Sequence, residues 1–152
     1  MDRTFQGHPR LSLAAAIPQK VCPLVTRRAG DQRQLLAFAH PLAGHQFVKG
    51  SIEPGEAPVR AAIRELAEES GIRLMVPPAF LGAFPVGPDG QIWHFFDCQT
   101  PALPDRWQHR TEDGGGLLFD FFWHPFSKEP GGDWHPVFHD AYGVIHRLLG
   151  GD

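Results

Sequence analysis

The chain has 152 residues, a length at which one hydrophobic core closes comfortably and two do not. Its 14 basic and 17 acidic residues leave a formal charge of -3, so no overall positive field attracts a nucleic-acid backbone. No stretch approaches the roughly 20 apolar residues that a membrane-spanning helix needs. We therefore expect a single domain over residues 1–152, outside the membrane, with polymeric nucleic acid disfavoured as a partner.

Two features of the sequence bear on the cellular location of the protein. The apolar run at residues 11–17 follows two arginines, as in a secretion signal, but it is short and Pro18 ends it. We therefore expect an irregular N-terminal segment over residues 1–18. Cys22 and Cys98 lie in separate apolar runs without the spacing of a redox or zinc motif. Buried free thiols and a cytoplasmic location follow as expectations.

The first half of the chain predicts a pair of strands followed by a helix. Residues 21–26 and 35–39 are apolar runs typical of strands, and residues 29–31 between them have turn chemistry. The helix is expected from about residue 57 to residue 70, because apolar side chains recur there at helical spacing. Gly71 is suited to end it.

The second half predicts three more strands and a second helix. The strands are expected at residues 79–86, 92–98 and 117–123, and the helix begins near residue 133 and ends near residue 149. Residues 101–116 form a polar connection that ends in three glycines. Loops of that length are more often functional than idle. Together these elements predict a mixed sheet covered by helices.

Three glutamates fall on one side of the first predicted helix. At about 100° per residue, Glu65, Glu68 and Glu69 share one sector, away from the apolar stripe. Carboxylates one turn apart repel by roughly 0.2–0.5 kcal/mol, and no lysine in the helix pairs with them. Hard oxygen ligands on a rigid element suit Mg²⁺ or Mn²⁺. By themselves, the three glutamates fit a solvated acidic face as well as a metal site.

The spacing of a longer segment decides between these interpretations. From Gly50 to Ile72 the chain reads Gly, five residues, Glu, seven residues, Arg-Glu-apolar, one residue, Glu-Glu, one residue, Gly-apolar. This pattern resembles the Nudix box at every defining position. Each such residue type occurs at about one position in fifteen, so chance explains the match poorly. The resemblance implies an α/β fold, the Nudix-type α/β/α sandwich with a mixed β-sheet, and a hydrolase of phosphoanhydride bonds.

The resemblance also implies metal ligands. Glu65 and Glu69 are the implied principal ligands of Mg²⁺ or Mn²⁺, and Glu68 supports them directly or through water. A backbone carbonyl of Lys49 or Gly50 is expected to complete the shell.

The resemblance implies that other positions of the box either fix its geometry or accept a proton from the attacking water. Arg64 counts among the catalytic positions because, with Glu56, it is expected to brace the loop against the helix. Gly71 permits backbone geometry that a side chain would hinder, and Glu53 matches a less strict acidic position. Glu68 and Glu112 are candidates for the general base. Glu112 lies in the long loop, where a solvated acid is the alternative interpretation.

Residues near the box carry the clues to the substrate. Lys49 resembles the lysine of family members that handle polyphosphate chains and can contact a phosphate as a point charge. Phe47 and Trp93 are candidates for stacking on a base, although such aromatic side chains more often belong to a core. These residues favour a small-molecule nucleotide or dinucleoside polyphosphate. ADP-ribose-like and other sugar nucleotides are alternatives.

A second class of function and a self-association remain as alternatives. A Nudix-like fold can bind nucleotides or proteins as a catalytically silent module. The complete set of box glutamates favours an enzyme. The Phe-rich residues 119–126 could form either core or the interface of a homodimer.

Overall fold

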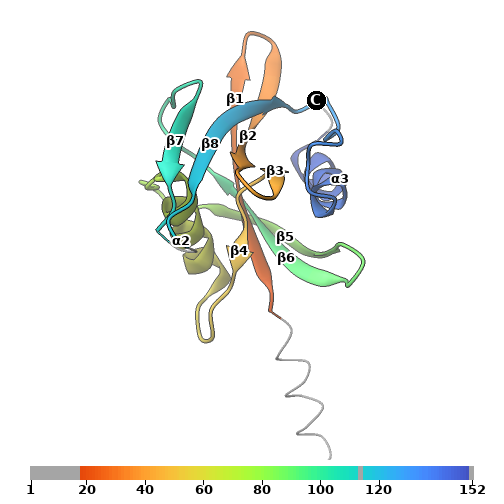
Figure 1. The fold of residues 1–152 in the computed structure, drawn as a ribbon. Helices are drawn as coiled ribbons and strands as arrows, with labels where there is room; N and C mark the ends of the chain where they lie inside the picture. The colour runs from red at the N-terminus through yellow and green to blue at the C-terminus, as the bar shows by residue number, and fades with distance from the viewer. Residues whose placement is uncertain (1–17, 113–114, 151–152) are drawn as a thin grey trace, which may run out of the picture.

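A mixed β-sheet runs through the middle of the molecule and carries helices on both faces (Figure 1). The structure is a computed structural model that describes residues 18–112 and 115–150. Apart from Pro18, the predicted N-terminal segment lies outside these residues. The elements in chain order are β1 (Lys20–Ala29), β2 (Gln32–His40), β3 (Gly44–Gln46), β4 (Gly50–Ser51), α2 (Pro58–Ser70), β5 (Ala79–Val86), β6 (Gln91–Cys98), β7 (Trp107–Arg110), β8 (Leu118–Pro125) and α3 (Val137–Leu149).

The strand order explains how distant parts of the chain meet. The described strands follow the order β5-β6-β1-β2-β8-β7, with β3 paired to β2 and β4 paired to β1. β1 and β6 run parallel, and the other pairings are antiparallel. The predicted hairpin forms as β1 and β2, whose turn contains Gly30 at a φ of 67°. The central parallel pair makes the sheet mixed, as the sequence predicted.

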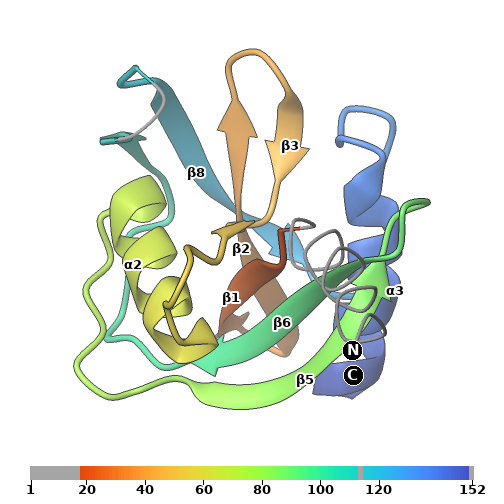
Figure 2. The ribbon, with the colours of Figure 1, turned by 90° about the horizontal axis from the view of Figure 1, so that it is seen from below.

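The sheet is buried on both faces. The neighbouring residues Val21 and Cys22 of β1 point into different cores, because side chains alternate along a strand. α2 covers one core and α3 covers the other, as two views of the ribbon show (Figures 1 and 2). The α/β/α sandwich implied by the sequence is therefore confirmed. No helix among residues 18–112 and 115–150 is long and apolar enough to cross a membrane.

Two elements differ from the sequence prediction. Part of the predicted 101–116 loop is strand β7, too short for its pattern to stand out; there the ring of Trp107 stacks on Phe121 at a centroid distance of 5.1 Å. The second helix begins at Val137 and not near residue 133. The carbonyl of Asp133 instead accepts a hydrogen bond from the His45 amide at 2.9 Å, which holds this stretch against β3.

The Phe-rich strand is core and not a surface. β8 lies between β2 and β7, and Phe119, Phe121 and Phe126 are at most 6% exposed. These three rings therefore belong to the core, the first of the two alternatives for residues 119–126, and a homodimer stays a prediction.

Candidate metal and phosphate site

Helix α2 ends at Gly71, directly after the glutamates of the box. Gly71 adopts the left-handed conformation with a φ of 81° and donates its amide to the carbonyl of Ala67 at 2.9 Å. A Cβ at Gly71 would lie 2.9 Å from Nδ1 of His109. Glycine is therefore required here by both the backbone and the neighbouring strand.

Arg64 joins the loop before α2 to the helix. Its Nε and Nη2 donate to the two carboxylate oxygens of Glu56 at 2.8 and 2.9 Å, and Nη2 also donates to the carbonyl of Ser51 at 3.0 Å. Glu56 in turn accepts the amide of Glu53 at 3.0 Å. The hydrogen bonds from Arg64 lower the pKa of Glu56. This bidentate pair is the loop-to-helix brace that the sequence suggested.

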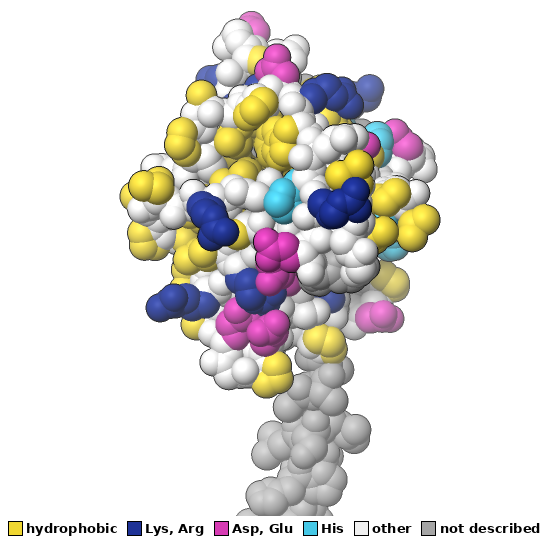
Figure 3. All heavy atoms as spheres, turned by 60° about the vertical axis from the view of Figure 1, so that its left-hand side comes forward, with side chains coloured by type: hydrophobic (Ala, Val, Ile, Leu, Met, Phe, Trp, Pro, Cys, Tyr) yellow, Lys and Arg dark blue, Asp and Glu magenta, His cyan; other side chains and the backbone are white. Residues whose placement is uncertain are grey.

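The same guanidinium reaches the acidic side of the helix. Nη1 of Arg64 donates to Glu65 at 2.9 Å and to Glu68 at 3.1 Å, and it lies 3.9 Å from Glu53. Figure 3 shows acidic side chains gathered around basic ones on the face that carries α2. Arg64 therefore offsets part of the repulsion among these carboxylates.

Glu65 and Glu69 lie side by side where solvent is scarce. Glu65 is 6% exposed. Burial raises the pKa of Glu65, and burial together with the charge of Glu65 raises the pKa of Glu69 well above its usual range. Glu69 also accepts a hydrogen bond from the backbone amide of Lys49. Two adjacent carboxyl groups, Glu65 buried and Glu69 half-buried, are costly to ionise together unless a cation neutralises them.

Gly50 lets strand β4 approach this pair. A Cβ at Gly50 would overlap the carboxyl group of Glu65. The backbone of Gly50 therefore lies directly against a predicted metal ligand, where no side chain fits.

These groups surround one pocket of about 530 Å³. Its lining comprises Lys20, Gly50, Ser51, Glu53, Arg64, Glu65, Glu68, Glu69 and Glu112. Glu112 comes from the connection after β7, so the fold brings it to the box from far along the chain. Sequence reasoning missed Lys20, whose Nζ donates to Oγ of Ser51 at 2.8 Å and whose pKa burial lowers. The one signal for it was its place at the start of a predicted strand.

The carboxylates as they stand do not form a metal cage. Among residues 18–112 and 115–150, no three His, Cys, Asp or Glu side chains are arranged to hold an ion. The reason is that Arg64 occupies oxygens of Glu65 and Glu68, while Glu65 and Glu69 hydrogen-bond to each other. The oxygen-rich donor set and the adjacent carboxyl pair nevertheless fit the chemistry of a hard divalent ion.

A second pocket of about 310 Å³ lies at Lys49. Gln46, Gln91, Trp93, His135 and Phe138 are among its lining residues. Within the described residues, the Lys49 ammonium has no ion-pair partner and lies 6.0 Å from the ring centroid of Phe138.

The two aromatic side chains predicted to stack on a base are core residues. Phe47 is 1% exposed and packs on Trp134 at 4.8 Å, so the prediction that its ring stacks on a base is wrong. Trp93 is also 1% exposed, but it lines the second pocket, and its indole Nε1 has no hydrogen-bond partner among the described atoms. The face of its ring is therefore not open for stacking on a base.

Comparisons with known proteins agree with this geometry. The family model described as the NUDIX domain matches residues 19–141. Among curated proteins, no sequence matches the chain.

Solved structures of similar fold belong to distant sequences. A MutT protein from Methanosarcina mazei Go1 superposes with a TM-score of 0.61 at 16% identity, over 86% of this chain and 93% of that one. An Ap4A hydrolase from C. elegans gives 0.56 at 15% identity, over 86% and 92%. The Bacillus subtilis pyrophosphohydrolase BsRppH gives 0.55 at 21% identity, over 88% and 80%. These likenesses establish the fold.

Proposed function

Because the chain belongs to the Nudix family of hydrolases, which act on phosphoanhydride bonds, we propose that it is a Mg²⁺- or Mn²⁺-dependent pyrophosphohydrolase of nucleotides. Its substrate is a nucleoside diphosphate derivative, with a dinucleoside polyphosphate or nucleotide favoured. The observation that carries the proposal is the adjacent pair of Glu65 and Glu69 in a pocket lined by further carboxylates and by Lys20, with Glu65 buried against the backbone of Gly50.

The box residues would hold the metal. Glu65 and Glu69 supply the principal oxygens, with Glu68 and the backbone carbonyl of Gly50 or Lys49 beside them. When bound, a divalent ion neutralises phosphate oxygens and makes water a stronger acid. Arg64 acts as a positioning residue, since its contacts fix the loop and the helix relative to each other.

The remaining residues of the site bind the phosphate chain and accept the proton of the attacking water. Lys20 and Lys49 orient the phosphate chain as point charges. Water forms a bond to one phosphorus, the bridging P–O bond breaks, and two phosphate-ended products leave. Of the two candidates for the general base, we favour Glu112, because Glu68 is already held by Arg64 at 3.1 Å.

The second pocket supports a nucleotide substrate. Its volume of about 310 Å³ is at the lower end of the roughly 300–1,000 Å³ typical of ligand pockets, so it suits one compact group. Lys49 borders both this pocket and the predicted metal shell. A phosphate chain held by Lys49 could thus place one nucleoside in the pocket, beside the Trp93 indole. The fold shared with the C. elegans Ap4A hydrolase is consistent with a dinucleoside polyphosphate. ADP-ribose-like and other sugar nucleotides are the alternatives.

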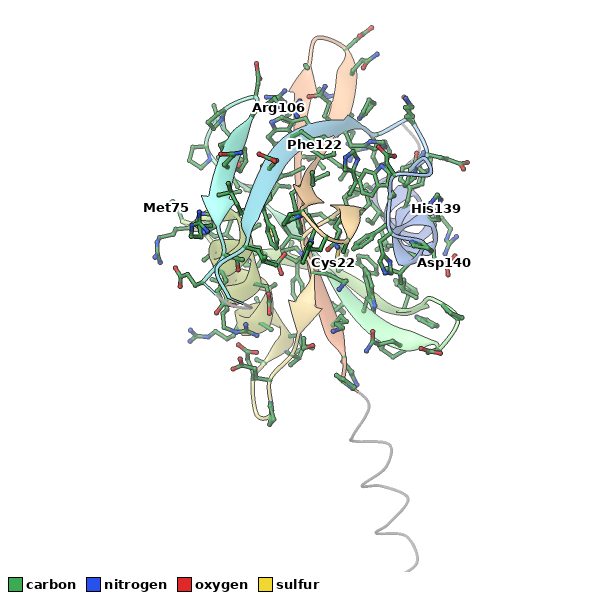
Figure 4. All side chains as sticks on the ribbon, viewed as in Figure 1. Cys22, Met75, Arg106, Phe122, His139 and Asp140 are labelled. Carbon is green, nitrogen blue, oxygen red and sulfur yellow. The ribbon has the colours of Figure 1, made fainter. Side chains whose placement is uncertain are left out.

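A cytoplasmic location is part of the proposal. Cys22 lies in the interior (Figure 4), and burial raises the pKa of its thiol. Burial likewise raises the pKa of Cys98 to about 12. Both are free thiols, as suits a reducing compartment that contains nucleotides.

One observation favours a second candidate, a module that binds nucleotides without turning them over. The carboxylates in the described residues are engaged with Arg64 and with each other and are not arranged around an ion. A silent module could keep this arrangement permanently, whereas an enzyme must open it when the metal enters.

Product release from a nucleotide panel with Mg²⁺ or Mn²⁺ tests the proposal. The panel contains dinucleoside polyphosphates, nucleoside triphosphates, ADP-ribose and sugar nucleotides. We expect metal-dependent turnover of a preferred substrate, its loss in Glu69→Gln, and no change in Glu129→Gln, which alters an exposed acid outside the site. Nucleotide binding without turnover of any compound would replace the enzyme with the binding module.

A further inference from the structure

Glu112 reaches the pocket of about 530 Å³ from the loop that joins β7 to β8. β7 ends at Arg110, which pairs with Leu118 of β8, and the amide of Thr111 donates to the carbonyl of Leu117 at 2.8 Å. Glu112 is therefore the first residue beyond the paired backbone. Within the described part of the chain, its carboxylate has no hydrogen-bond or ion-pair partner. The path of the loop backbone therefore sets the place of this carboxylate.

The side chain of Arg110 ties the two ends of this loop together. Its Nη1 donates to the carbonyl of Gly116 at 2.7 Å. A Cβ at Gly116 would lie 3.7 Å from Cδ and 3.8 Å from Cγ of Arg110, so the arginine stem crosses the loop at ordinary contact distance. A hydrogen bond from a charged donor is stronger than one between neutral groups. Arg110 thus fixes the far end of the loop to the strand that leads to Glu112.

The far end of the loop needs such a tie. Gly115 and Gly116 have φ angles of 90° and 74°, in the left-handed region that favours glycine. Holding a glycine in one conformation costs more backbone entropy than holding any other residue. The near end is anchored differently, since Thr111 is only 6% exposed. The hydrogen bond from Arg110 therefore offsets part of the entropy lost in ordering the glycine end.

We propose that Arg110 is a positioning residue, which holds this loop so that Glu112 faces the attacking water. The inference rests on the proposed function, in which Glu112 is the general base that accepts the proton of that water. The carboxylate must then lie within about 3.2 Å of the water, and a misplacement of about 1 Å can cost about a hundredfold in rate. Arg110 does not line the pocket itself, so its effect passes through the loop.

Arg110→Met tests the tie, because methionine keeps an apolar stem across Gly116 but cannot donate. We expect kcat to fall about tenfold with KM within a factor of about two, since the groups that bind the phosphate chain are unchanged. Arg110→Lys keeps a charged donor and should recover part of the loss. Arg33→Met is the matched control and should leave kcat unchanged, because Nη1 of Arg33 also donates to a backbone carbonyl, that of Leu149, at 2.9 Å.

A double-mutant cycle separates positioning of Glu112 from a general stabilisation of the hairpin. Glu112→Gln alone is expected to lower kcat about a hundredfold. Adding Arg110→Met should then lower kcat no further, because the carboxylate that the tie positions is gone. The same loss from Arg110→Met with and without Glu112, or full activity of Glu112→Gln, would overturn the proposal.

Amide hydrogen exchange of the metal-free chain follows the tie without any turnover. Arg110→Met is expected to speed exchange of the Thr111 amide at least about threefold, and Arg33→Met is not. An unchanged exchange rate at Thr111 would contradict the tie. If the unmodified chain turned over no nucleotide, the proposed function and the role of Arg110 would fail together. Turnover that Glu112→Gln lowers and Arg110→Met leaves intact would contradict the role of Arg110 alone.

Discussion

Helices α2 and α3 are each 13 residues long and cover opposite faces of the sheet, but they bury different chemistry. α3 buries apolar side chains such as Phe138 and Ile145. α2 buries Ala61, Ala62 and Leu66 together with the carboxylate Glu65. We infer that α3 stabilises the fold by burying apolar side chains. α2 stabilises it less, because it buries a carboxylate at the candidate site.

The contrast extends to the residues around each helix. The carboxylates of α2 require Arg64 as a partner and Gly50 as a space for Glu65. The apolar face of α3 packs against the sheet without a charged partner, and the hydroxyl of its Tyr142 donates to the carbonyl of Phe126 at 2.6 Å. Substitutions on α2 should therefore change activity more than stability, and those on α3 should do the reverse.

The largest expected effect is on turnover, from Glu69→Gln in α2. Removing one ligand charge is expected to lower kcat about a thousandfold, equivalent to about 4 kcal/mol of activation free energy. The melting temperature should not fall, because the substitution removes a buried like-charge contact with Glu65. Steady-state kinetics and thermal unfolding of one preparation measure both. A fall in stability that matches the lost activity would remove the contrast between the helices.

Ile145→Ala in α3 is expected to act in the opposite way. Ile145 is fully buried, so its truncation should lower the free energy of unfolding by about 3 kcal/mol through lost burial and a cavity. Turnover per folded molecule should stay within a factor of about two at a permissive temperature. Urea unfolding followed by fluorescence gives the first value. An unchanged midpoint would mean that α3 is not the stabilising helix.

A pair of glycine substitutions, with expected effects of intermediate size, tests the same contrast between the surroundings of α2 and α3. Gly50→Ala drives a Cβ into the carboxyl group of Glu65 and should cost about 2 kcal/mol in stability, in metal-dependent activity, or in both. Gly143→Ala in α3 meets nothing within 4 Å and should stabilise the protein by about 0.5–1 kcal/mol. Parallel denaturation and kinetics test the pair. If both substitutions had the same sign, the close approach at Gly50 would be refuted.

The smallest expected effect is a pH dependence on the α3 side. Burial lowers the pKa of His124 below its ordinary 6.5, and its Nε2 lies 2.6 Å from the carbonyl of Lys128. The unfolded chain therefore binds a proton at a higher pH than the folded chain, so acid favours unfolding as the pH falls below about 6.5. His124→Gln should lose less stability than the unmodified chain between about pH 7 and pH 5. Equal losses would contradict a buried neutral His124.

The sequence predicted the features of the fold and site that depend on the spacing of nearby residues. The helix containing Glu65, Glu68 and Glu69, its end at Gly71, and the α/β/α arrangement follow from periodicity and from the box. The pairing of Arg64 with Glu56 followed from the resemblance. These features depend on residues close together in the chain, so one sequence can show them.

Features set by distant contacts were not predictable in the same way. β7 exists because Trp107 packs on Phe121, and Lys20 reaches the site because β1 lies beside β4. Phe47 has the pattern of either a pocket wall or a core residue, and only the packing of α3 decides for the core. The placement of Glu112 in the pocket likewise needed the whole fold.

Calorimetric titration with Mn²⁺ of the unmodified chain, Glu69→Gln and Glu129→Gln tests most directly whether α2 buries its carboxylates to hold a metal. We expect binding by the unmodified chain and by the Glu129→Gln control, with affinity at least about tenfold weaker in Glu69→Gln, because a ligand charge is lost. Equal Mn²⁺ affinity in all three proteins, or no binding by the unmodified chain, would contradict the account.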